Sequence, residues 1–207
     1  MTMDGRILVL CEHPPLVLVL DPDSQRAASI ALVPGDRGVL ADVFDESSSA
    51  REGLLVLPDW HLLVAKEKDP PLLVEFGPRD ADAAGVVPDS LGTADWGPVP
   101  PAGDLGDLRA LAAWRLDDDI DDISDLASAD GTLYCLSDRS RRVVAVELPL
   151  DPGAERAHIH ESWELSLPER RGEPDGKPEG LAVTGDRTLL VGLDTETPRA
   201  NLCWFPS

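Results

Sequence analysis

The chain has 207 residues, of which 18 are Lys or Arg and 39 are Asp or Glu, giving a formal net charge of −21. A surface this acidic repels phosphate backbones and anionic membranes, so nucleic-acid and membrane partners are excluded and cations are favoured. The 19 Pro and 17 Gly residues argue against long helices and favour many short strands. Apolar residues make up 43%, enough for one domain with a real core.

The N-terminal region predicts a soluble, cytoplasmic protein. No basic segment precedes the apolar run that starts at Ile7, and Glu12 to Pro15 interrupt that run. It therefore has the pattern of neither a signal peptide nor a membrane span. Three cysteines without CxxC spacing are expected to be buried free thiols in a reducing compartment; they are Cys11, Cys135 and Cys203.

Four stretches along the chain share one pattern: an apolar strand, a polar turn with an acidic residue, and a second apolar strand. They are Arg6–Leu20, His61–Phe76, Thr132–Leu148 and Thr188–Phe205. The aligned acidic residues are Glu12, Glu67, Asp138 and Asp194, separated by 55, 71 and 56 residues. Two near-equal periods and one lengthened by an insertion indicate a structural repeat.

An upstream strand precedes the last three copies. It contains Glu52-Gly53-Leu54, Ser124-Asp125-Leu126 and Glu179-Gly180-Leu181 in turn. Further strands are expected after the second apolar strand, at Leu111–Leu116 and His158–Leu167. About four antiparallel strands per unit predict an all-β, propeller-like domain of about four blades that spans residues 1–207.

Two polar segments do not fit a blade. The Pro-, Gly- and Asp-rich segment at about 77–107 is expected to be a long surface loop inserted between strands. Arg170 to Lys177 is expected to be a shorter polar loop. Neither has the character of a domain boundary.

The order and spacing of these motifs resemble the SdiA-regulated family, within the phytase-like (esterase-like) group of six-bladed propellers. The segments that carry the resemblance are LLVAKEKDPPLLVEF, ISDLASADGTLYCLSDRSRRVVAVEL and KPEGLAV. The resemblance implies a calcium-associated propeller. It extends from about Gly5 to Phe205, apart from the inserted loop.

The chain departs from that family in blade number. It contains three full units and the tail of a fourth, and the first copy begins at its second strand. An unclosed propeller leaves exposed sheet edges. We expect a partial six-bladed propeller whose start codon lies upstream, and the alternative is a reduced propeller that closes differently.

The hairpins bring acidic residues to one rim, because the start of the first strand and the end of the second lie at the same edge. With the upstream strand innermost, these carboxylates converge on the mouth of the central channel, where they repel one another unless a cation is present. Oxygen ligands favour Ca²⁺ or Mg²⁺ over zinc. The predicted metal ligands are Glu52, Asp125 and Glu179, with Glu12, Glu67, Asp138 and Asp194 as further rim acids. The alternative is that these acids only cap strands and turns.

The acidic run from Asp117 to Asp125 does not match an EF-hand, because Asp122 and Ser128 occupy the positions that need Gly and Glu. We expect a solvated turn in which only Asp125 points inward. Lys66 and Arg139 beside the acidic turns are candidate anion-binding residues.

These observations predict a calcium-binding scaffold that presents an acidic channel mouth to a small anionic ligand or a protein partner. One alternative is a metal-dependent hydrolase of phosphate or carboxylic esters, in which the metal polarises the substrate and Lys66 or Arg139 holds its anion. The other is an inactive propeller fragment.

Overall fold

The computed structural model describes residues 5–23, 25–36, 38–41, 43, 51–91, 106–117, 120–167, 169–170, 173–174, 176–195 and 201–205. In these ranges the protein is all-β, as predicted, with two short 3₁₀ helices, η1 (Gly38–Leu40) and η2 (Pro88–Ser90). No helix among these residues is long and apolar enough to cross a membrane.

The strands form four antiparallel meanders, here called blades 1 to 4. Blade 1 contains β1 (Ile7–Cys11), β2 (Leu16–Asp21) and β3 (Arg26–Val33). Blade 2 contains β4 (Arg51–Val56), β5 (Leu62–Lys66), β6 (Leu72–Pro78) and β7 (Asp107–Leu116). Blade 3 contains β8 (Asp125–Ala129), β9 (Thr132–Ser137), β10 (Arg142–Val146) and β12 (Ile159–Glu164). Blade 4 contains β15 (Lys177–Val183), β16 (Leu189–Asp194) and β17 (Leu202–Phe205).

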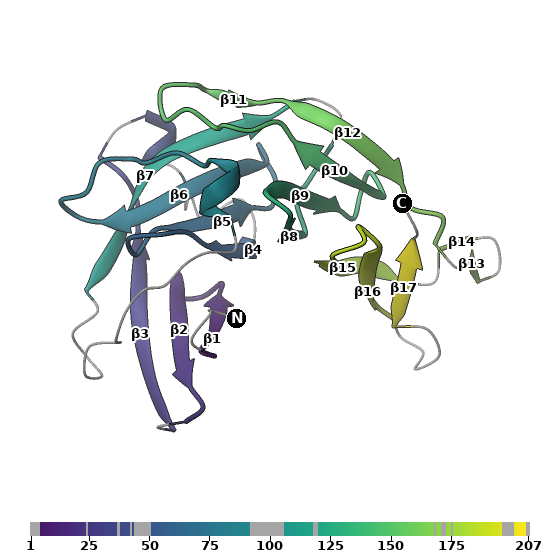
Figure 1. The fold of residues 1–207 in the computed structure, drawn as a ribbon, viewed down its shortest axis with the longest axis horizontal. Helices are drawn as coiled ribbons and strands as arrows, with labels where there is room; N and C mark the ends of the chain where they lie inside the picture. Colours follow the sequence, from purple (N-terminus) through teal and green to yellow (C-terminus); the bar gives the residue numbers. More distant parts are fainter. Residues whose placement is uncertain are drawn as a thin grey trace.

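The blades stand side by side in an arc, with β4, β8 and β15 on its inner side and β7 and β12 on its outer side (Figure 1). The inner strand β8 contacts β4 on one side and β15 on the other. All four predicted hairpins are present, as the pairs β1–β2, β5–β6, β9–β10 and β16–β17. The propeller-like blade plan is therefore confirmed.

The hydrophobic core lies between blades, which explains why the central strands are continuous apolar runs. Along β5, alternate side chains point to opposite faces. Leu62 and Val64 pack in the cluster shared with blade 1, whereas Leu63 and Ala65 pack in the cluster shared with blade 3. A third cluster joins blades 3 and 4 through residues such as Leu136 and Val191. A strand buried on both faces must be apolar throughout.

Backbone contacts add to this packing. The outer strands β3 and β7 pair in parallel, so blades 1 and 2 share one continuous sheet. The two-residue strand β11 (Arg156–Ala157) pairs with β7 of blade 2. It connects the segment that precedes β12, the outer strand of blade 3, to blade 2. A Cβ atom added at Gly53 would lie 2.7 Å from the backbone N of Leu126, so glycine allows β4 and β8 to approach closely.

The faces at the two ends of the arc are apolar and exposed. On β1, Ile7 and Val9 are 44% and 40% exposed, and on β17, Leu202 and Trp204 are 55% and 69% exposed. Strand β1 corresponds to β5, since each is followed by an acidic turn and a second apolar strand. Within the described residues, the first strand of blade 1 is thus the equivalent of β5.

The predicted insertion at 77–107 falls between β6 and β7, and its residues 92–105 lie outside the described residues. Its described part is not entirely at the surface. Val86 is fully buried, forms a β-bridge with Leu150, and packs with Leu91 in the core between blades 2 and 3. A short hairpin of β13 (Glu169–Arg170) and β14 (Glu173–Pro174) lies within the second polar segment.

Candidate functional site

Glu52 and Glu179 occupy equivalent positions at the start of the inner strands of blades 2 and 4. In β4 the pairing register skips Glu52 between Arg51 and Gly53, and in β15 it skips Glu179 in the same way before Gly180. Each glutamate therefore sits at a β-bulge, which turns its side chain out of the regular alternation.

The acidic turn residues lie at the ends of the neighbouring strands. Glu12 and Glu67 directly follow β1 and β5, and Asp138 directly follows β9. Asp194 ends β16 and is paired with Lys177 at the start of β15. The hairpins thus bring an acidic turn next to the start of the inner strand in blades 2 and 4.

The electrostatics of Glu52 include negative charges from three blades. The pKa of Glu52 is raised to about 7, first by burial and then by the negative charges of Glu12, Glu179 and Glu67, while Lys68 opposes the rise. Glu12 belongs to blade 1, Glu67 to blade 2 and Glu179 to blade 4.

Glu179 extends the same group of charges. Burial raises its pKa most; Lys177 opposes the rise, whereas Asp138, Asp194 and Glu67 add to it. We call these six acids the acidic mouth: Glu12, Glu52, Glu67, Asp138, Glu179 and Asp194.

Asp125 occupies a different strand position from Glu52 and Glu179. The pairing of Leu126 with Cys135 matches that of Leu54 with Val64, so Asp125 stands at the position of Gly53. Its Oδ1 accepts the N–H of Leu126 at 2.8 Å, and its Oδ2 accepts the N–H of Leu181 in blade 4 at 2.7 Å. Both oxygens thus bond to backbone amides, and the Oδ2 bond joins blade 3 to blade 4. Burial raises the pKa of this carboxyl to about 6 against these two hydrogen bonds.

The glutamate position of blade 3 is occupied by Ser124. Its Oγ accepts the backbone N–H of Asp138 at 2.9 Å, so it organises the acidic turn. The pKa of Asp138 is raised by burial and by Asp122, against the charges of Lys177, Arg141 and Arg139.

The candidate anion-binding residues are placed differently from each other. Lys66 is 4% exposed, and its Nζ donates to the carbonyl oxygens of Lys68, Asp69 and Pro70 at 2.6, 3.1 and 3.3 Å. Its three N–H groups therefore hold the β5–β6 turn. Arg139 is exposed and follows Asp138 in the blade 3 turn.

A buried arginine links the acidic mouth to blade 1. Nη1 of Arg51 donates to the backbone oxygen of Glu12 at 2.6 Å. Burial lowers the pKa of this guanidinium, and the negative charge of Glu12 opposes the decrease. The contact fixes the β1–β2 turn against β4.

The acidic mouth supplies oxygen donors of the kind found in calcium sites. Carboxylate oxygens are the donors that Ca²⁺ prefers. However, within the ranges that the structure describes, no three His, Cys, Asp or Glu side chains are grouped closely enough to hold one ion. The donor type fits calcium, whereas the spacing is not that of an assembled site.

Two buried carboxylates were not recognised in the sequence. Asp122 is 2% exposed and accepts hydrogen bonds from the Ser137 hydroxyl and the backbone N–H of Arg139. The prediction that only Asp125 of the acidic run points inward was therefore wrong, because the blade 3 turn needs an acceptor for its amides.

Glu75 is the second of these carboxylates and is fully buried. Its Oε1 lies 2.6 Å from Nδ1 of His61 and accepts the N–H of Ala84, and its Oε2 accepts the N–H of Gly85. This network anchors the described part of the insertion to blade 2. The only sequence signal was one acid inside the apolar run LLVEF.

No protein-family model matches the chain, and no curated protein matches it. Among solved structures it is similar to U3-55K, with 11% identity and a TM-score of 0.46 over 98% of this chain and 52% of that one. It is also similar to a proposed 6-phosphogluconolactonase from Bacteroides fragilis, with 13% identity and a TM-score of 0.49 over 100% of this chain and 56% of that one. The chain thus spans about half the length of these two proteins, and its propeller-like fold rests on the blades described above.

Proposed function

We propose that this domain is a cation-binding propeller scaffold, in which Ca²⁺ is taken up by the acidic mouth and completes a surface for a small ligand or protein partner. The observation that supports the proposal is the raised pKa of Glu52, which is caused first by burial and then by the negative charges of Glu12, Glu179 and Glu67 from three blades, with Lys68 opposing the rise only in part. A divalent ion would relieve this repulsion and draw the carboxylates together.

Glu52 and Glu179 are the proposed principal ligands, with Glu12 and Glu67 completing the set from blades 1 and 2. Asp125 is not among the proposed principal ligands, because each of its oxygens already accepts a backbone N–H, from Leu126 and from Leu181. The resemblance to the calcium-associated SdiA-regulated group remains a sequence-based prediction consistent with this role.

Lys66 disfavours a metal-dependent hydrolase in which it holds the anionic group of an ester, because its ammonium is engaged by three backbone carbonyls of its own turn. The exposed Arg139 is the other residue that this alternative would use. A bound calcium would remain available to attract an acidic group of a partner.

Thermal unfolding in Ca²⁺ and in EDTA tests the proposal, with NaCl added to equalise ionic strength because any salt screens a net charge of −21. Calcium at a hundredfold excess over its Kd should stabilise the fold by about 2.7 kcal/mol. Glu52→Gln and Glu179→Gln should each reduce this gain, whereas Glu155→Gln, which removes an exposed charge, should not. Equal stabilisation by Ca²⁺ and by matched NaCl would refute a calcium site.

A further inference from the structure

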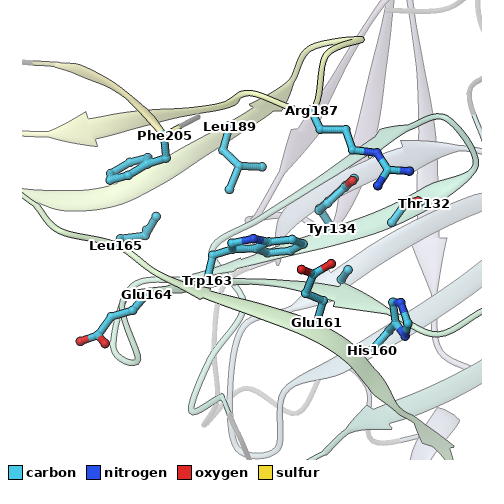
Figure 2. A pocket seen from close by; sticks show the side chains of 11 residues that line it. Thr132, Tyr134, His160, Glu161, Trp163, Glu164, Leu165, Arg187, Leu189 and Phe205 are labelled. Carbon is cyan, nitrogen blue, oxygen red and sulfur yellow. The ribbon is translucent and has the colours of Figure 1, made fainter. Parts of the chain in front are cut away.

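A second concave site lies between blades 3 and 4 and shares no residue with the acidic mouth. It has a volume of about 390 Å³ and is formed by β9, β10, β12, β17 and the turn and strand from Arg187 to Leu189. Figure 2 shows its lining side chains, with Trp163 at the centre. This volume is in the range of small-molecule pockets.

One part of the pocket is aromatic and apolar. The rings of Trp163 and Tyr134 lie with centroids 6.0 Å apart and planes inclined by 39°. Leu165, Leu189 and Phe205 lie beyond the indole, on the side away from His160 (Figure 2). An apolar side chain bound here would have the indole on one side and aliphatic groups at its end.

Another part of the pocket is polar and contains the hydroxyl group of Tyr134. Tyr134 is 3% exposed, and its hydroxyl has no hydrogen-bond partner among the described residues. The hydroxyl end of the side chain lies near Arg187 (Figure 2). This hydroxyl reaches the pocket surface and is therefore available to a ligand.

Two opposite charges border the same space from different blades. Arg187 extends from the β15–β16 turn and Glu161 from β12, and Figure 2 shows both directed toward the region around Trp163 and Tyr134. Neither forms an ion pair with any described residue. The pocket therefore offers a cationic group, Arg187, and an anionic group, Glu161, from different blades, whereas a second acid of the lining, Glu164, is directed away from Trp163 (Figure 2).

We propose that this pocket binds a free α-amino acid with a large apolar side chain. Its carboxylate would bond to Arg187 and the Tyr134 hydroxyl, and its ammonium to Glu161. Its side chain would pack on Trp163 toward Leu189. A zwitterion satisfies both wall charges, whereas a simple carboxylate would leave Glu161 unpaired and would approach a strongly acidic protein.

Isothermal titration calorimetry with L-phenylalanine tests the proposal on the unaltered chain. Three analogues each remove one recognised group: N-acetyl-L-phenylalanine lacks the ammonium, phenethylamine lacks the carboxylate, and glycine lacks the side chain. L-Phenylalanine should bind, and each analogue should bind at least about tenfold more weakly, the loss expected from about 1.4 kcal/mol. Absence of binding by L-phenylalanine, or equal binding by any analogue, would overturn the proposal.

Variants identify the groups that carry the recognition. Arg187→Gln should weaken L-phenylalanine binding about tenfold or more but leave the weak binding of phenethylamine unchanged, because phenethylamine has no carboxylate. Glu161→Gln should weaken L-phenylalanine and spare N-acetyl-L-phenylalanine, and Tyr134→Phe tests the hydroxyl. Arg79→Gln, which removes an exposed charge outside the pocket, is the matched control. Equal losses in Arg79→Gln and Arg187→Gln would contradict the assignment.

Discussion

Glu52→Gln is expected to stabilise the protein at pH 8 and to have little effect at pH 5. The pKa of Glu52 is about 7 in the folded protein and 4.5 as the ordinary value. A raised carboxyl pKa contributes stability that is fully present below pH 4.5 and is lost as pH rises through 7, because the folded state holds the proton more tightly. Gln carries no charge at either pH and therefore does not show this loss.

The magnitude of the stabilisation by Glu52→Gln follows from the difference between the folded and ordinary pKa values of Glu52. A difference of about 2.5 pH units corresponds to roughly 3 kcal/mol for a fully buried group. Glu52 is only half-buried, so solvent screening reduces the expected gain at pH 8 to about 1 kcal/mol. For a chain of this length, that gain raises the midpoint of thermal unfolding by about 2–4 °C.

Urea unfolding at pH 5 and pH 8, in EDTA and at low salt, measures the free energy of unfolding directly. Glu155→Gln makes the same charge change at an exposed site and controls for the reduction in net charge. The reasoning about converging carboxylates fails if Glu52→Gln stabilises equally at both pH values, or no more than Glu155→Gln does at pH 8.

Three further substitutions test two contacts between blades and the contact that anchors the insertion to blade 2. Asp125→Ala removes the acceptor of two backbone N–H groups, one of them in blade 4, and should cost about 1–3 kcal/mol in urea unfolding at pH 7.5. Asp80→Ala, at an exposed position, should cost almost nothing, and equal losses would contradict the role of Asp125. Gly53→Ala places a Cβ against the next strand and should destabilise by about 1–3 kcal/mol, whereas Gly185→Ala has open space and should not; the same assay compares them. Glu75→Ala leaves a buried histidine and two amides without their acceptor, so amide hydrogen exchange at residues 84–85 should accelerate, and unchanged protection there would refute the anchor.

The hairpins were predictable because each one carries its own local signals. In His61–Phe76, two apolar runs flank a polar turn, and β5 and β6 pair across that turn. The strand β3 was missed although its alternation is readable, since Ala28, Ile30 and Leu32 are its buried residues. Its small residues make the pattern weaker than that of the Val- and Leu-rich strands.

The candidate site was less predictable, because a side chain's role depends on register and on contacts between blades. Asp125 was grouped with Glu52 as an acid near a strand start, but the alignment of Leu126 with Leu54 places it at the glycine position. That alignment was readable in the sequence. The hydrogen bond from Leu181 was not, since it joins residues 56 positions apart through tertiary packing. Metal binding by Glu52 and Glu179 remains a prediction.

The location of the core between blades has a consequence for how the protein unfolds. Blade 4 contributes to one apolar cluster, whereas blade 3 contributes to two. Repeat proteins of this kind behave as chains of nearest-neighbour couplings, in which each interface is a separate cooperative link. Loss of blade 4 breaks one link and leaves the others intact, whereas blade 3 cannot open without disrupting both of its neighbours. Protection from hydrogen exchange should therefore be greatest in the middle of the chain, at β5 and β9, and should decrease toward both ends.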